Sequence, residues 1–159
     1  MNREEINSHI NLVTPNLIRF AKSVTPNRNE AIDLISDALS VYLIKSADDL
    51  LILEGGLAGR DASFLRKEIL HSILKEIYKL GLKNTEQYQH SIQDHGAFKS
   101  FYALDLRMRT YLFLENKMGF SQKDLQKFFG LKTHELTEIK FNAKKLILKD
   151  YQDVREVYQ

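Results

Sequence analysis

The sequence predicts an all-α protein. Apolar residues recur three and four positions apart in almost every long segment, which is the spacing of one face of a helix, whereas strand-like alternation is scarce. Both prolines, Pro15 and Pro26, lie near the N-terminus, so the rest of the chain lacks the residue that most strongly breaks helices. We expect two small helical units joined by a polar linker.

The first two helices are expected in the N-terminal quarter of the chain. The first covers about residues 3–24, with Pro15 breaking it or opening its second half. The next begins after Pro26, because Asn27 is a good N-cap and Glu30 stands three residues on, as a capping-box partner would. Apolar residues cover about 200° of this second helix at 100° per residue, so we expect it to be wedged between two neighbours.

A narrow polar ridge remains on the second helix. It consists of Glu30, Asp33, Ser36, Asp37 and Ser40. One interpretation is solvation, with the two most N-terminal acids placed favourably in the first helical turn. The other is a docking surface for another protein.

The third helix and a linker follow. A glycine-rich loop, LEGGLAGR, precedes a helix expected from Ser63 to Lys79. The next stretch, GLKNTEQYQHSIQDHG, is polar, lacks helical periodicity and has glycine at both ends, which is typical of a linker. We therefore predict a first domain over residues 1–80, a linker over 81–98 and a second domain over 99–159.

The second domain carries a helix-turn-helix pattern. It begins with an amphipathic helix, FYALDLRMRTYLFLEN, after which Ser121 and Asp124 predict the N-terminal cap of a short helix ending near Phe129. Gly130 then supplies a turn, and a longer helix starts around Thr133. A short helix, a glycine-containing turn and a longer helix are typical of helix-turn-helix units, although an ordinary helical hairpin has the same pattern.

Composition narrows the classes of function. The 23 lysines and arginines nearly balance 21 aspartates and glutamates, so net charge is weak evidence for nucleic-acid binding. The absence of cysteine excludes disulfides and thiolate chemistry. The five histidines lack metal-ligand spacing and no catalytic frame is recognisable, so we expect no enzyme, no metal and no cofactor. Without a signal core or a membrane-length apolar run, a cytoplasmic protein with no membrane partner is expected.

Two stretches resemble the sigma-70 family of bacterial transcription initiation factors. DLISDAL, preceded by LIRFAKSVTPNRNEAI, resembles the DLVQD stretch of the family's region 2. FSQKDLQKFFGLKTHELTEIKFNAKKLIL is similar in spacing to region 4, where LS…EIA…LG precedes a helix ending in ARKAL. Matching places are held by Ser121, Gly130, Leu131, Leu136, Ala143, Lys144 and Lys145. Two short helical units without a middle domain resemble the small extracytoplasmic-function type.

The resemblance implies a sigma-like initiation factor that binds RNA polymerase core and directs it to promoter DNA. In the family, region 2 docks on the clamp coiled coil, so the implied polymerase-binding residues are Asp33, Ser36, Asp37 and Ser40. Region 4 reads DNA with its second helix, and the implied DNA-binding residues are Lys132, Thr133, Glu135, Thr137, Lys140, Lys144 and Lys145. The alternative is a divergent sigma-like regulator that binds polymerase or an anti-sigma factor without recognising promoters itself.

Several residues depart from the family pattern. Gln126 replaces the alanine normally packed inside the first helix of the helix-turn-helix. Glu135 and Glu138 stand on the reading helix, where carboxylates can accept a hydrogen bond from cytosine but repel phosphates. The lysines of this helix suit phosphate contacts, but a lysine-rich face can also be merely solvated. Acids interleave the third helix and the loop before it, so strand opening has the least support among the family's functions.

The last helix shows a second apolar face. Its main face consists of Leu136, Ile139, Ala143, Leu146 and Ile147. Phe141 and Leu148 lie nearly opposite and seven residues apart, which resembles a contact surface. Either a partner contacts this pair, or the C-terminal tail, with Tyr151, Val154 and Val157, folds back to cover it.

Overall fold

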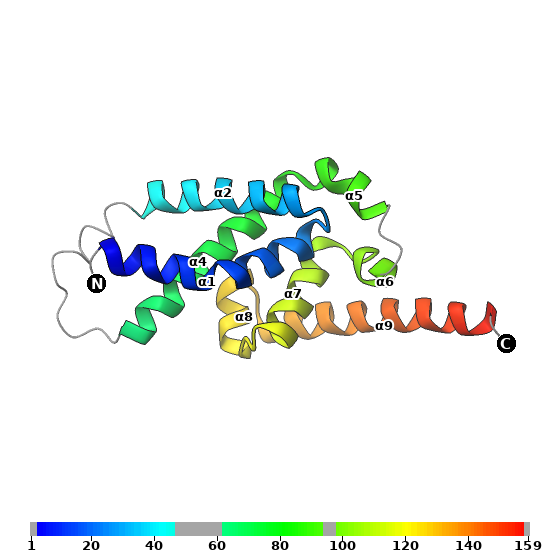
Figure 1. The fold of residues 1–159 in the computed structure, drawn as a ribbon. Helices are drawn as coiled ribbons and strands as arrows, with labels where there is room; N and C mark the ends of the chain where they lie inside the picture. The colour runs from blue at the N-terminus through cyan, green and yellow to red at the C-terminus, as the bar shows by residue number, and fades with distance from the viewer. Residues whose placement is uncertain (1–2, 47–61, 94–97, 158–159) are drawn as a thin grey trace. The chain divides into compact units, whose positions relative to one another are not determined.

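The structure is a computed structural model that describes residues 3–46, 62–93 and 98–157. Over these residues the chain forms helices and no strand, so the all-α prediction is confirmed (Figure 1). In the part of the chain that is described, no helix combines the length and the apolar character that a membrane span requires. The glycine-rich loop LEGGLAGR lies outside the described residues.

The chain divides by its contacts into two compact units. Unit 1 comprises Met1–Lys22 and Asn27–Lys83, and unit 2 comprises Ser23–Pro26 and Asn84–Gln159. Relative to the predicted first domain, 1–80, the division differs mainly in one short segment. The last two residues of α1 and the next two, Ser23–Pro26, belong with the C-terminal part of the chain.

Helix α1 runs without interruption from Arg3 to Val24 and contains Pro15. The break or restart expected at this proline is absent. Pro15 removes only one backbone donor, and the hydroxyl of the preceding residue, Thr14, donates to the carbonyl oxygen of Ile10 at 2.9 Å. Leu17, Phe20 and Ala21 in the following two turns are fully buried, so burial holds the helix together beyond the proline.

Helix α2 spans Arg28–Lys45 and starts as predicted. The side chain of Asn27 accepts a hydrogen bond from the backbone N–H of Glu30 at 3.0 Å, which satisfies one of the free donors at the helix start. The buried residues are Ala31, Leu34, Ile35, Ala38 and Tyr42. They cover only about 100° of arc at 100° per residue. The buried face of α2 is therefore about half as wide as the apolar arc that the sequence predicts.

Helix α4 spans Ala62–Lys83, which is longer than the predicted helix at both ends. It packs against α2 within unit 1 (Figure 1). The carboxylate of Glu76 is nearly buried, and its Oε1 lies 3.0 Å from Nζ of Lys45 on α2 and 3.8 Å from Nζ of Lys79. Glu76 of α4 thus links this helix to α2.

Much of the range expected to be a linker is helical. Helix α4 continues to Lys83, a 3₁₀ turn η1 covers Thr85–Tyr88, and a short helix α5 covers Gln89–Gln93. Tyr88 is buried, which anchors this otherwise polar stretch. Residues 94–97 lie outside the described part of the chain.

Further helices follow in the part of unit 2 that the structure describes after α5. These are α6 (Lys99–Tyr102), α7 (Leu106–Lys117), α8 (Gln122–Phe129) and α9 (Thr133–Val157). The single amphipathic helix expected over FYALDLRMRTYLFLEN is two helices. The reason is Asp105, whose side chain accepts a hydrogen bond from the backbone N–H of Met108 at 2.8 Å and so caps a new helix start.

A buried arginine fastens the short segment 23–26 inside unit 2. Nε of Arg109 donates to the carbonyl oxygen of Ser23 at 2.8 Å, and Nη2 donates to that of Val24 at 3.2 Å. Nη1 donates to the carbonyl oxygen of Leu104 at 2.6 Å, and the guanidinium carbon lies 5.7 Å from the ring centre of Tyr102. Only 4% of the residue is exposed. The planar fork of donors suits such a site, because it satisfies several buried carbonyls at once.

We predict that Arg109→Met lowers the free energy of unfolding of the full chain by about 3 kcal/mol, because several buried carbonyls would lose their donor. Chemical denaturation followed by circular dichroism measures this. Arg107→Met, an exposed neighbour on the same helix, is the matched control and should stay within about 0.5 kcal/mol of the parent. Equal stability of the two variants would contradict the role given to Arg109.

Candidate functional site

Helices α8 and α9 form the predicted short helix, glycine turn and longer helix, a pattern that a helix-turn-helix shares with an ordinary helical hairpin. The Ser121 hydroxyl accepts a hydrogen bond from the Asp124 N–H at 3.1 Å, and the Asp124 carboxylate accepts one from the Ser121 N–H at 3.3 Å. This capping box confirms the predicted start of α8. Gly130 ends α8 with φ 65°, a left-handed conformation that glycine adopts without steric cost, and α9 begins three residues later.

An aromatic cluster holds α8 in place. The ring of Phe128 packs edge-on against Phe120 at 6.1 Å and against Phe129 at 5.0 Å, and Phe129 stacks on Tyr111 of α7 at 6.3 Å. Leu125 and Leu136, one from each helix of the pair, are fully buried. Packing between α7, α8 and α9 therefore gives the longer helix a rigid support.

Gln126 connects the two helices of the pair. Its side-chain amide donates to the hydroxyl of Thr133, the first residue of α9, and its backbone carbonyl accepts hydrogen bonds from the N–H groups of Gly130 and Leu131. The family's alanine could not make the first of these contacts. The departure at this position has a local structural use, but the hydroxyl of Thr133 is thereby engaged within the protein.

Lys132 precedes α9, and the first two turns of the helix contain Thr133, Glu135 and Thr137. The Lys132 N–H points to the carboxylate of Glu135 at 3.4 Å, which is the arrangement of a helix-capping acid. The Thr137 hydroxyl donates to the carbonyl of Thr133 at 3.0 Å but stays exposed. Glu135, expected to contact DNA, is half-buried and directed at its own helix start, whereas Lys132, Thr133 and Thr137 are exposed.

Lys140, another expected DNA contact, forms an ion pair inside the unit. Its Nζ lies 2.7 Å from Oε1 of Glu115 on α7, and the Tyr111 hydroxyl donates to the other carboxylate oxygen at 2.8 Å. Burial raises the pKa of the Glu115 carboxyl, but the hydrogen bonds from Lys140 and Tyr111 outweigh burial and lower this pKa overall. The hydrogen bond to Glu115 correspondingly raises the pKa of Lys140. No sequence spacing signals this pair, because the partners are on different helices.

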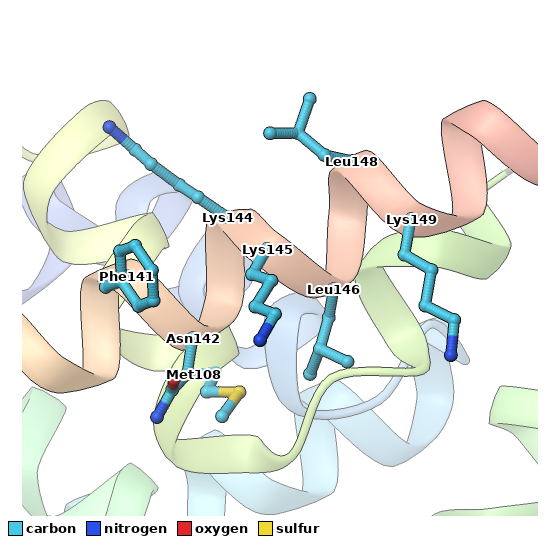
Figure 2. Close-up of a pocket in the computed structure, with 8 residues that line it drawn as sticks. All are labelled: Met108, Phe141, Asn142, Lys144, Lys145, Leu146, Leu148 and Lys149. Atoms are coloured by element: carbon cyan, nitrogen blue, oxygen red, sulfur yellow. The ribbon is translucent and has the colours of Figure 1, made fainter.

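The exposed surface of α9 has two sides. At 100° per residue, Thr133, Thr137, Lys144, Leu148 and Phe141 fall within about 80° of one another. Phe141 and Leu148 are 65% and 59% exposed. Lys145 is exposed on another side: Figure 2 shows Lys144 and Lys145 projecting from α9 in opposite directions. The structure thus separates two lysines that the sequence suggested as one DNA-binding set.

The C-terminal tail does not cover this apolar pair. Tyr151, Val154 and Val157 belong to α9 itself, which continues as one helix to Val157 (Figure 1). A fold-back of this segment onto Phe141 or Leu148 is therefore wrong for the described part of the chain. The side chains of residues 151–157 lie outside that part.

The expected polymerase-binding residues lie together on α2. Asp33, Ser36, Asp37 and Ser40 are all exposed. The Ser40 hydroxyl donates to the Ser36 carbonyl at 3.0 Å, which keeps it close to the helix surface. Two residues missed by the sequence reasoning, Ile32 and Leu43, border this ridge and are 42% and 43% exposed. Their apolar character predicted burial, so only the packing of the helix could place them on the surface.

Three comparisons with known proteins found no counterpart. No protein-family model, curated protein or solved structure matches the chain.

Acidification should weaken unit 2 through the Glu115 carboxylate. The pKa of this group is lowered in the folded protein, so its stabilising effect is present at neutral pH and is lost as the pH falls through the folded-state value. We predict that Glu115→Gln costs about 1 kcal/mol at pH 7, after allowance for the partly exposed Lys140, and less at pH 3. Urea unfolding at both pH values measures this.

Glu138→Gln is the control for that experiment. Glu138 is an exposed carboxylate on the same helix as Lys140, and its replacement should change stability by less than about 0.5 kcal/mol at either pH. If Glu115→Gln loses as much stability at pH 3 as at pH 7, the ion pair is not the source of its effect.

Proposed function

We propose that this chain is a bacterial sigma-like transcription initiation factor, which acts in the cytoplasm, binds RNA polymerase core through α2 and binds promoter DNA through α9. One observation carries the proposal. The residues that match the family's polymerase-binding stretch lie on α2 in unit 1, and those that match its DNA-binding stretch lie at the start of α9 and along it in unit 2. Each set includes neighbouring exposed positions. The helix-turn-helix geometry of α8 and α9 supports the DNA-binding part.

The proposed polymerase-binding surface combines charge with apolar area. Asp33 and Asp37 supply negative charge for a basic patch on a coiled coil, and Ser36 and Ser40 are small enough for a close approach of a helix. The adjacent exposed Ile32 and Leu43 would supply apolar area to bury, which charged residues alone cannot. We therefore add these two residues to the surface.

The proposed DNA-binding surface is the side of α9 that bears Thr137 and Lys144, together with Lys132 at the helix start. In helix-turn-helix proteins the N-terminal residues of the second helix reach base edges, which suits the exposed Thr137 hydroxyl. Lys132 and Lys144 suit phosphate contacts, which position the protein without giving it sequence preference. Lys140 and Glu135 act in this proposal as structural residues of the helix-turn-helix.

Core binding and transcription together test the proposed function. Purified protein is incubated with polymerase core, and promoter-dependent transcription is then measured with promoters selected from genomic DNA of the source cell. Binding with specific transcription supports the initiation factor, and the absence of core binding contradicts it.

Asp37→Arg should weaken binding to polymerase core by about tenfold or more, because it places a positive charge where a basic partner patch is expected. Folding should be nearly unaffected, since exposed substitutions away from caps and core change stability by about 0.5 kcal/mol or less. Thermal melting and core-binding assays are run in parallel with Glu4→Arg, an exposed acid-to-arginine change on α1 of the same unit. Equal core binding by both variants would exclude α2 as the docking surface.

Replacing Lys132 and Lys144 with alanine should weaken binding to every duplex alike. The slope of log affinity against log salt should fall by about two units, or roughly one for each lost phosphate contact. Lys140→Ala should leave that slope unchanged. Fluorescence anisotropy over a salt series measures both. An unchanged slope for the double variant would mean that these two lysines are merely solvated.

A second candidate function is a regulator that binds polymerase or an anti-sigma factor without reading promoters. The observation in its favour is the exposed pair Phe141 and Leu148, which lies on the same side of α9 as Thr137 and Lys144. Two large apolar side chains there suit a protein partner better than a phosphate backbone. Core binding without promoter-dependent transcription in the assay above would favour this function.

A further inference from the structure

A shallow groove runs along α9 beside Met108 of α7. It has a volume of about 840 Å³ and is lined by residues of α9 and by Met108 of α7. Figure 2 shows Lys145, Leu146 and Lys149 projecting toward the side on which Met108 lies, whereas Lys144 and Leu148 project the other way. The groove therefore belongs to unit 2 alone, and its edge reaches Lys144 of the proposed DNA-binding surface.

The groove combines an apolar floor with a basic rim. Met108 is half-buried and Leu146 is 45% exposed, so apolar atoms remain uncovered between the two helices. Lys145 and Lys149 are exposed and stand one helical turn apart on the same edge, and the lining residues that the structure describes include these lysines and no acid.

We propose that this groove binds an acidic amphipathic helix of a partner protein. Its apolar face would lie on Met108 and Leu146, which removes their side chains from water. Its acidic residues would meet Lys145 and Lys149, and acids one turn apart on the partner match the spacing of the two lysines. Phe141, exposed at one end of the groove, extends the apolar contact by a further turn of α9.

Charge and shape together favour this occupant over others. A nucleic-acid backbone would match the lysines but would leave Leu146 and Met108 without an apolar partner. A second copy of the chain would bring the same lysines against each other if the contact were symmetric, which is repulsive. An acidic amphipathic helix can place its carboxylates against the lysines of the rim and its apolar face on Met108 and Leu146.

The test uses the full chain and a fluorescein-labelled synthetic peptide of about 16 residues, long enough to form a helix. The peptide carries leucines along one helical face and glutamates on its flanks. A second peptide has the same composition in an order that destroys the apolar face. Fluorescence anisotropy should detect binding of the first peptide and at least tenfold weaker binding of the second, because both carry the same charge.

Lys145→Glu with Lys149→Glu should weaken binding of the amphipathic peptide by about tenfold or more. Lys117→Glu with Lys123→Glu makes the same change of net charge at exposed positions of α7 and α8 outside the groove, and should leave binding unchanged. Circular dichroism confirms that both variants are folded. Leu146→Asp tests the apolar floor of the groove separately and should abolish binding of the amphipathic peptide.

Three results would overturn the proposal. The first is equal binding of the two peptides, which would indicate unspecific attraction of charge. The second is unchanged binding by the Lys145 and Lys149 double variant. The third is that duplex DNA, anionic lipid vesicles or self-association, and not the peptide, depends on these two lysines. Failure of the DNA-binding proposal is scored by a different measurement, the salt dependence of duplex binding by the Lys132 and Lys144 double variant.

Discussion

Unit 2 depends most on the hydrogen bonds that the guanidinium of Arg109 donates. This group donates to the carbonyl oxygens of Ser23 and Val24 at the end of α1 and to that of Leu104 just before its own helix. Segments more than eighty residues apart in the chain therefore share one buried cation. Burial lowers the pKa of Arg109, opposed by Tyr102 and Asp105, but arginine keeps its charge in proteins. A lysine, with one compact ammonium, could not reach these carbonyls together.

Several polar side chains of α8 and α9 are used within the fold and are not available to a ligand. Gln126 and Glu135 are used at the start of α9, and Lys140 is paired with Glu115. What remains for a ligand is the exposed side with Thr137 and Lys144 and the groove with Lys145 and Lys149. The two sides of α9 differ in chemistry, so one helix could serve two partners at once.

Local signals in the sequence predicted local structure well. The caps at Asn27 and Ser121, and the turn at Gly130, depend on residues within three positions of each other, and all three form. Features that depend on distant residues were missed. Ile32 looked like a core residue by type, yet its exposure is decided by the neighbours that α2 packs against.

The candidate site also has features that local sequence predicts and features that depend on packing between distant residues. The helical faces of the proposed contact residues follow from the period of the helix, which the sequence contains. The pairing of Lys140 with Glu115 and the groove beside Met108 depend on how α7 meets α9, and no spacing along the chain encodes that contact. For the same reason, the restart of the helix at Asp105 was overlooked: its capping signal lay inside an amphipathic pattern that also fits one longer helix.

The packing of α9 also determines how readily its turns unfold locally. Ala143 is the last fully buried side chain described on this helix, Ile147 is half-buried, and Leu148 and Lys149 are exposed, so the described turn after Ala143 is held less by packing than the turns before it. Short unsupported helical segments are marginal in water, and their amide protons exchange with solvent sooner than those of packed turns. A ligand bound in the groove would slow amide exchange around Lys149 without altering the fold. Part of its binding free energy would then be spent on reducing the local opening of this part of α9.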